Sequence, residues 1–332
     1  MYNFVITNPI NNKALDIIND VGSYYLANDS NPNNYIEKME NADALIVSIA
    51  SCDQNVIKNS HNLKVIGRTG VGYDTVDVNL ATKYGIPVVI TPGANSRSVA
   101  EATIGALFAL SKKIIEVNCI TRSGNWNRAR NEEKFIELYG KTIGIVGVGN
   151  IGSIVANFCQ SLGMRVIWYD PYVDSLDLKV EKCGIKYEEI NKLIKDSDFI
   201  SLHVPLTDET KNMISYNEFK LMKSSAYIIN YSRGGLINEI DLIKALDDKL
   251  ISGAAIDTFE KEPIDKNYPL LKSNKIIISP HSASQSDQAQ INVAKMCIEG
   301  CLAILNRKKW PYVADINVYN HKKWKDCEWA DI

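Results

Sequence analysis

The stretch Lys141–Asp170, KTIGIVGVGNIGSIVANFCQSLGMRVIWYD, decides the fold of this chain. It opens with an apolar, β-branched run, Thr142–Val148, which predicts a buried parallel strand. Apolar residues then recur at helical intervals, so a helix is expected to begin inside the glycine motif that follows the strand. A second expected strand, Met164–Tyr169, ends at Asp170, 18 residues beyond the last motif glycine. The G-x-G-x-x-G spacing is carried by Gly147, Gly149 and Gly152.

Each part of this stretch has a physical role in binding a dinucleotide. The first glycine permits the tight turn, the second lets the backbone approach a pyrophosphate, and the third lets the helix pack closely on the strand. The helix N-terminus offers N–H groups to the phosphates. Asp170 can accept both hydroxyls of an adenosine ribose and would repel a 2′-phosphate, which favours NAD over NADP. A lone glycine motif is as often an ordinary turn, but its setting between two strands predicts a dinucleotide site.

Bulk composition is that of a globular enzyme. The 332 residues are 45% hydrophobic and carry a formal net charge of −2, so neither nucleic-acid binding nor disorder is indicated. The start, MYNFVITNPI, has no basic leader, and no apolar run reaches the roughly 18 residues of a membrane span. The seven cysteines are scattered without a C-x-x-C pair, and no metal site is expected. These features predict a cytoplasmic protein with no membrane or nucleic-acid partner.

Alternating strands and helices predict an α/β protein with two doubly wound parallel-sheet domains of the Rossmann type. The first domain is expected to comprise residues 1–96 plus a returning segment, 285–332, and the second, residues 97–284, to bind the dinucleotide. The ligand cleft is expected between them, at the carboxyl ends of the strands. Further strands are predicted at Phe4–Thr7, Ala44–Val47, Lys64–Arg68, Pro87–Ile90, Asp198–Val204, Ala226–Tyr231, Ser252–Asp257 and Lys275–Ser279.

Two loops and one helix complete the linear pattern. Arg68–Asp74 follows a strand and contains glycines, so it is either an anion-binding nest or a plain βα turn. Thr91–Ser98 leads into Val99–Val117, which predicts one long helix rich in small residues. Residues 119–141 are more polar and are interpreted as an arm that reaches a partner subunit.

Three chemically suitable residues follow strand ends in the dinucleotide domain. Arg233, Glu262 and His281 together suit hydride transfer at a carbinol carbon. An imidazole can take the hydroxyl proton as hydride leaves, and a neighbouring carboxylate fixes its ring. A guanidinium forms a fork for a substrate carboxylate. Taken singly, each residue is more often structural, but their shared placement beside a nicotinamide site favours a catalytic set.

At this point the sequence resembles a known family, the D-isomer-specific 2-hydroxyacid dehydrogenases. The resemblance spans about residues 40–300 and rests on an ordered set of motifs. These are GRTGVGYD (67–74), TPGAN (91–95), VAE (99–101), GVGNIG (147–152), HVPLT (203–207), NYSRGG (230–235), DTFEKEP (257–263) and SPH (279–281).

The resemblance implies roles for particular residues. Arg233, Glu262 and His281 match the substrate arginine, the orienting glutamate and the acid/base histidine. The family typically forms a homodimer through its cofactor domains, and the same is expected here. Cofactor-binding residues are expected at Gly147, Gly149, Asn150, Ile151, Gly152, Asp170, His203, Val204, Pro205, Tyr231, Ser232, Arg233, Asp257 and His281. Substrate-binding residues are expected at Arg68, Val71, Gly72, Asn95, Arg233 and His281.

The expected activity is the NAD-dependent interconversion of a 2-oxo acid and a D-2-hydroxy acid. The closest resemblance is to short-type D-3-phosphoglycerate dehydrogenases, with 3-phosphoglycerate as one candidate substrate. Those enzymes usually carry Arg-Ser-Ala after the second strand, whereas this chain has Ser48-Ile-Ala; Arg68 or Arg97 could replace the missing arginine. The alternatives are an unphosphorylated or specialised 2-oxo acid, such as hydroxypyruvate, glyoxylate or a phosphonate analogue, and a dinucleotide-sensing interaction protein of the corepressor type.

Overall fold

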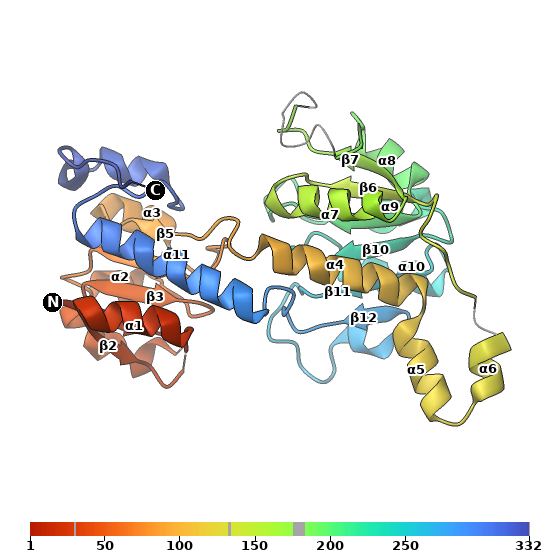
Figure 1. The fold of residues 1–332 in the computed structure, drawn as a ribbon, viewed down its shortest axis with the longest axis horizontal. Coiled ribbons are helices and arrows are strands. Elements are labelled where there is room, and N and C mark those ends of the chain that lie inside the picture. Colours follow the sequence, from red (N-terminus) through yellow and green to blue (C-terminus); the bar gives the residue numbers. More distant parts are fainter. Residues whose placement is uncertain (30, 132–133, 175–182, 332) are drawn as a thin grey trace. The chain divides into compact units, whose positions relative to one another are not determined.

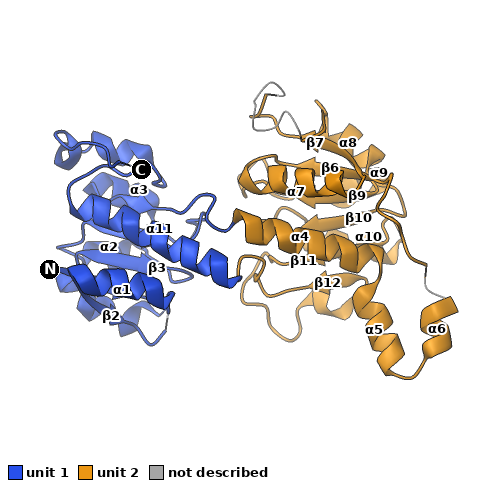
Figure 2. Ribbon diagram, in the orientation of Figure 1, with its two compact units in different colours: residues 1–95, 286–332 blue, residues 96–285 orange. Residues whose placement is uncertain are grey.

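The chain divides into two units, which the computed structural model describes over residues 1–29, 31–131, 134–174 and 183–331. Unit 1 consists of residues 1–95 and 286–332, and unit 2 of residues 96–285 (Figure 2). Residues 132–133 of the expected arm and residue 332 of the C-terminal segment fall outside the described residues. Within the described part of the chain, no helix has the length and apolar character needed to cross a membrane.

Unit 1 is built on a parallel sheet of five strands in the order β2-β1-β3-β4-β5. The helices α1 (Asn12–Val21) and α11 (Asp287–Leu305) cover one face (Figure 1), while α2 (Gln54–Lys58) and α3 (Val78–Tyr84) cover the other. The strands are β1 (Tyr2–Ile6), β2 (Gly22–Leu26), β3 (Ala44–Val47), β4 (Val65–Arg68) and β5 (Val88–Val89). Short 3₁₀ turns lie at Pro32–Asn34, Ile36–Asn41, Ile316–Asn320 and Lys322–Trp324.

Side-chain alternation along the strands forms two cores in unit 1. In β1, Phe4 and Ile6 pack under α1 and α11, and Val5 packs on the opposite side. The segment after α11 closes the first core, because Trp324 is buried and its Nε1 donates to the carbonyl oxygen of Gly85 at 2.9 Å. The C-terminal residues thus belong structurally to the N-terminal sheet.

Unit 2 holds a parallel sheet of seven strands in the order β12-β11-β10-β9-β6-β7-β8. Helices α4 (Ser96–Ser111) and α7 (Asn150–Ser161) cover one face, and α8 (Ile190–Asp196), α9 (Tyr216–Leu221) and α10 (Glu239–Asp247) cover the other. The strands are β6 (Thr142–Val146), β7 (Arg165–Tyr169), β8 (Ile185–Lys186), β9 (Phe199–Leu202), β10 (Tyr227–Asn230), β11 (Gly253–Ile256) and β12 (Ile276–Ile278). A 3₁₀ turn, Pro269–Lys272, precedes β12.

The predicted α/β class with two doubly wound parallel sheets is confirmed, with three local corrections. Strands β2 and β8 lie at sheet edges and were not predicted; β2 begins with Gly22-Ser23, and only two of its five residues are even partly buried. The expected single helix Val99–Val117 is two helices, because α4 ends at Ser111 and Lys113 adopts a left-handed φ of 48°. After this break, α5 (Ile114–Arg122) and α6 (Trp126–Asn131) project from the layers of unit 2 (Figure 1).

The docking of α11 on β4 leads to a stability prediction. A Cβ at Gly67 would lie 2.7 Å from the Sγ atoms of both Cys297 and Cys301. Gly67→Ala should therefore lower the free energy of unfolding by about 1–3 kcal/mol, the usual cost of overpacking a core. In a Cys297→Ala, Cys301→Ala background, the same substitution should cost less, because only the close contact with Ile46 Cδ1 at 2.8 Å remains, as measured by urea unfolding. An equal loss in both backgrounds would contradict this packing.

Candidate active site

The glycine turn between β6 and α7 is held by close backbone contacts. Gly147 has a φ of 90°, and a Cβ there would lie 2.6 Å from the carbonyl oxygen of His203. A Cβ at Gly152 would lie 2.0 Å from the carbonyl oxygen of Gly147. The two glycines therefore cannot be exchanged for larger residues without moving the strand or the helix.

The residues around this turn fit a dinucleotide. A Cβ at Gly149 would meet no atom within 4 Å, and α7, which begins at Asn150, has no side-chain N-cap hydrogen bond. Its first amides are thus available to phosphate oxygens. Asp170 lies at the end of β7, and its Oδ2 accepts a hydrogen bond from the Val148 amide at 3.1 Å. A carboxylate at this place suits a ribose diol.

The ends of β9 and β10 bring further expected cofactor residues together. Ser232 Oγ donates to the carbonyl oxygen of Val204 at 2.6 Å. His203 Nε2 lies 2.9 Å from Ser201 Oγ, and burial lowers the pKa of His203 to about 4, so its ring is neutral at pH 7. Pro205 is exposed at the start of the next loop, and Ile151 is half-buried on α7. Burial raises the pKa of Tyr231, whose hydroxyl is hydrogen bonded to Ser279.

His281 and Glu262 form a direct pair. His281 Nδ1 lies 2.7 Å from Glu262 Oε2, and the His281 side chain is 48% exposed. Partial burial opposes ionisation of Glu262, but hydrogen bonds from His281 and the Phe259 amide outweigh it. Together with the charges of His281 and Arg233, these hydrogen bonds hold the pKa of Glu262 below its usual value. The structure thus places all three expected catalytic residues in unit 2, at the ends of β10, β11 and β12.

The turn that carries His281 wraps around the carboxylate of Asp257. Asp257 Oδ1 accepts hydrogen bonds from Ser279 Oγ at 2.6 Å and from the Ser282 amide at 2.9 Å, and Oδ2 accepts from the Ala283 amide at 3.0 Å. The turn places His281 itself at a left-handed φ of 51°. Asp257, expected as a cofactor contact, therefore has a structural task as well.

The remaining expected substrate residues, Arg68, Val71, Gly72 and Asn95, belong to unit 1. Val71 is exposed, and the Arg68 guanidinium donates to the carbonyl oxygen of Thr69. Arg97, one suggested replacement for the missing arginine, belongs to unit 2. It pairs with Glu101 at 2.6 Å and stacks 4.5 Å from the centre of the Phe158 ring.

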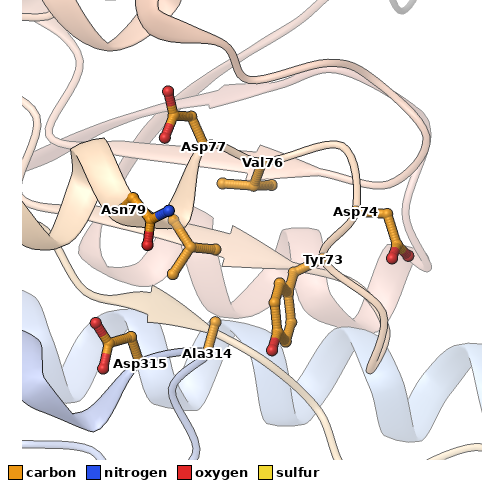
Figure 3. A pocket seen from close by; sticks show the side chains of 8 residues that line it. Tyr73, Asp74, Val76, Asp77, Asn79, Ala314 and Asp315 are labelled. Atoms are coloured by element: carbon orange, nitrogen blue, oxygen red, sulfur yellow. The ribbon is translucent and has the colours of Figure 1, made fainter. Parts of the chain in front are cut away.

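A cavity of about 410 Å³ lies in unit 1 and includes in its lining Tyr73 and Asp74, which directly follow Val71 and Gly72 in the sequence (Figure 3). Its carboxylates have structural partners: Asp77 accepts from the Leu80 amide, and Asp315 accepts from Thr82 Oγ1 and the Asn317 amide. No group of three metal-ligating side chains occurs among the residues that the structure describes. The cavity thus contains carboxylates that also stabilise the backbone around it. It is lined by Tyr73, Asp74, Val76, Asp77, Val78, Asn79, Ala314 and Asp315.

Sequence reasoning missed the residues that support the loops carrying the expected catalytic residues. Ser279 holds Asp257, and Asn230 Nδ2 donates to the carbonyl oxygen of Arg233 at 2.8 Å. Glu239 accepts the amide of Glu260, two residues before Glu262 in the same loop. Asn230 and Ser279 belong to the motifs NYSRGG (230–235) and SPH (279–281), but the sequence did not indicate that they hold these loops in place. Glu239, the first residue of α10, lies in none of the quoted motifs.

The fold and this set of side chains define a dinucleotide-dependent oxidoreductase. Residues 104–283 match the D-isomer specific 2-hydroxyacid dehydrogenase family, NAD binding domain. The chain therefore belongs to the D-isomer specific 2-hydroxyacid dehydrogenase family, which confirms the resemblance drawn from the motifs.

Named relatives within this family differ in their substrates. The chain is 41% identical over 292 residues to D-3-phosphoglycerate dehydrogenase of Methanocaldococcus jannaschii, covering 87% of this chain but only 55% of that one. It is 37% identical over 271 residues to glyoxylate reductase of Korarchaeum cryptofilum, covering 81% of each. It is also similar to the crystal structure of Aquifex aeolicus D-lactate dehydrogenase complexed with NAD and lactic acid, with 26% identity, a TM-score of 0.81, and coverage of 92% of this chain and 95% of that one.

The lowered pKa of Glu262 predicts a pH-dependent contribution to stability. A carboxyl group with a lowered folded-state pKa stabilises the fold above its unfolded pKa, near 4.5, and this contribution is lost as the pH falls through the folded value. The stability gap between wild type and Glu262→Gln should be full at about pH 6 and narrow below about pH 4.5, as measured by urea unfolding. The control is Glu40→Gln, at an exposed side chain, whose gap should not change with pH. A constant gap for Glu262→Gln would contradict the pairing.

Proposed function

We propose that this protein is an NAD-dependent dehydrogenase that interconverts a small 2-oxo acid and its D-2-hydroxy acid. The observation that carries the proposal is the 2.7 Å contact between His281 Nδ1 and Glu262, beside Arg233 and in the same unit as the dinucleotide turn. Unit 2 is accordingly proposed as the NAD-binding domain, while the assignment of unit 1 to substrate binding stays a prediction.

The proposed chemistry follows from how the imidazole is held. Because the Glu262 carboxylate accepts a hydrogen bond, it fixes the proton on Nδ1 and leaves Nε2 to exchange a proton with the substrate hydroxyl. Arg233 would anchor the substrate carboxylate through a forked pair of hydrogen bonds. NAD, when bound, supplies the hydride acceptor, and the reduced form supplies the donor.

The proposed cofactor preference rests on Asp170. A 2′-phosphate would meet the negative charge of this carboxylate at the end of β7, and the Val148 amide that donates to it is neutral and does not offset that charge. We therefore propose NAD(H) rather than NADP(H), with phosphates at the N-terminus of α7 and the ribose diol at Asp170.

The finer choice of substrate is supported by the arginines. Relatives are named for a phosphorylated acid in one case and for glyoxylate in another. Ser48 stands where a phosphate-binding arginine would be expected. Of the two suggested replacements, Arg68 donates to the backbone carbonyl oxygen of the next residue. Arg97 pairs with Glu101 and stacks on Phe158. These contacts favour an unphosphorylated acid such as glyoxylate or hydroxypyruvate over 3-phosphohydroxypyruvate.

We also propose a homodimer that uses the projecting helices of unit 2. Ile114 and Ile115 on α5 are 52% and 50% exposed, and Trp126 on α6 is 63% exposed. Apolar side chains gathered on a projecting hairpin are typical of a protein–protein interface. Sedimentation velocity of the purified protein distinguishes a monomer from a dimer.

Removal of the imidazole tests the proposed reaction. His281→Ala should lower turnover at least ~10²-fold, the scale of lost general acid–base catalysis, while NADH binding measured by fluorescence stays intact. The exposed His61→Ala serves as the matched control and should retain wild-type turnover. Turnover retained in His281→Ala would remove the basis of the proposal.

A substrate panel tests the finer choice. NADH oxidation would be followed with glyoxylate, hydroxypyruvate, pyruvate, 3-phosphohydroxypyruvate and a phosphonate analogue, with NADPH in parallel. We expect turnover of unphosphorylated acids with NADH. A strong preference for 3-phosphohydroxypyruvate would reverse the substrate proposal, and NADPH preference would reverse the role of Asp170. NADH binding without turnover of any acid would favour a dinucleotide-sensing protein.

A further inference from the structure

Glu239, the first residue of α10, ties this helix to the loop that carries Glu262. Its side chain is half-buried, and each carboxylate oxygen has a separate donor. Oε1 accepts a hydrogen bond from the Glu260 amide at 2.9 Å, and Oε2 accepts one from Tyr268 Oη at 2.6 Å. The carboxylate therefore joins three segments: the helix start, the loop after β11, and the segment before β12.

The anchored amide adjoins the one that orients the catalytic carboxylate. The Phe259 amide donates to Glu262 Oε1 at 2.9 Å, and Glu262 Oε2 faces His281. The next amide along the chain, that of Glu260, is the one held by Glu239. Phe259 is buried, and its ring meets Tyr268 edge to face at 5.8 Å. These two amides belong to consecutive peptide planes that share the Cα of Phe259. Anchoring the second plane therefore limits how far the first, which binds Glu262, can turn.

The opposite side of this peptide is held by the segment that carries Arg233. A Cβ at Gly234 would lie 1.9 Å from the carbonyl oxygen of Phe259, so the two backbones are in direct contact. The Phe259–Glu260 peptide is therefore enclosed between Gly234 and the Glu239 carboxylate. Any shift of this peptide would move Glu262 relative to both His281 and Arg233.

An ionised group at this place has an electrostatic cost. Burial raises the pKa of Glu239, and the nearby carboxylates of Glu260 and Glu262 raise it further, against the hydrogen bonds from Tyr268 and the Glu260 amide. Glu239 therefore stays close to Glu262 despite this cost for a structural reason. Its carboxylate oxygens accept hydrogen bonds from the Glu260 amide and from the Tyr268 hydroxyl at the same time.

We propose that Glu239, supported by Tyr268, is a positioning residue that holds Glu262 in place against His281. This inference rests on the proposed dehydrogenase function and deepens it, since it assigns a role in the reaction to residues that touch neither substrate nor cofactor. Glu239 acts through the Glu260 amide, and Tyr268 fixes the rotamer of Glu239.

A double-mutant cycle in the full chain tests the proposal. Glu239→Ala should lower kcat about tenfold, less than the loss of the acid/base group itself, and leave the Kd for NADH unchanged. In a Glu262→Ala background the same substitution should cost nothing further, because the group it positions is absent. An equal loss in both backgrounds, or no loss in the wild-type background, would overturn the proposal.

Conservative variants separate positioning from folding. Glu239→Gln keeps an acceptor oxygen for the Glu260 amide and should restore most of the kcat lost in Glu239→Ala. Tyr268→Phe should lower kcat by roughly threefold, and this effect should vanish in the Glu239→Ala background. Asp247→Ala removes an exposed carboxylate from the end of the same helix and should retain wild-type kcat. A Gln variant as impaired as the Ala variant would contradict the role of the acceptor.

Hydrogen–deuterium exchange tests the contact between Glu239 and the Glu260 amide without measuring turnover. In Glu239→Ala, the amides of both Phe259 and Glu260 should exchange faster than in wild type, because releasing the Phe259–Glu260 peptide also loosens the preceding peptide, whose amide binds Glu262. Faster exchange confined to Glu260 would overturn the inference. If the wild-type protein reduces none of the 2-oxo acids, the proposed function fails, and the exchange result still decides whether Glu239 positions Glu262.

Discussion

The backbone of α7 approaches the end of β6 so closely that only glycine fits at their contact. The carbonyl oxygen of Gly147 occupies the space that a Cβ of Gly152 would need. This contact sets where α7 begins, and α7 in turn packs with α4 over the central strands of unit 2. The ends of β7, β9 and β10 then surround the turn because all strands run parallel. The close contact between Gly147 and Gly152 thus fixes the turn at the sheet edge where the expected cofactor and catalytic side chains of unit 2 lie.

Hydrogen bonds to two buried or half-buried carboxylates fix the loops at this edge of the sheet. The carboxylate of Asp257 is enclosed by Ser279 and two amides of the His281 turn, and Glu239 encloses the loop of Glu262 from the other side. The imidazole and its carboxylate are thus set on two loops that are each fixed by a different acid. Such support matters because a displacement of about 1 Å at a reacting group can cost ~10²-fold in rate.

Runs of apolar residues predicted correctly those strands that are buried on both faces of a sheet. Every strand with a continuous apolar run was predicted within a few residues, and the expected catalytic residues were selected because they follow such strands. The edge strands β2 and β8 were missed because edges need no such run: β2 is half exposed and β8 has only two residues. The break between α4 and α5 was missed because Lys113 gives no warning of a left-handed φ. The support given by Glu239 and Asp257 depends on contacts across 21 to 26 residues, which periodicity cannot report.

The return of the chain to unit 1 has a consequence for synthesis on the ribosome. The sheet of unit 1 is complete after β5, yet one of its faces is covered by α11 and by the tryptophans that follow it. While residues 96–285 emerge and acquire their own core, Phe4, Ile46 and Val65 lack their final cover. The first sheet to be translated is therefore the last to be finished, and part of its apolar face stays uncovered for the whole interval, the kind of surface that promotes aggregation during folding.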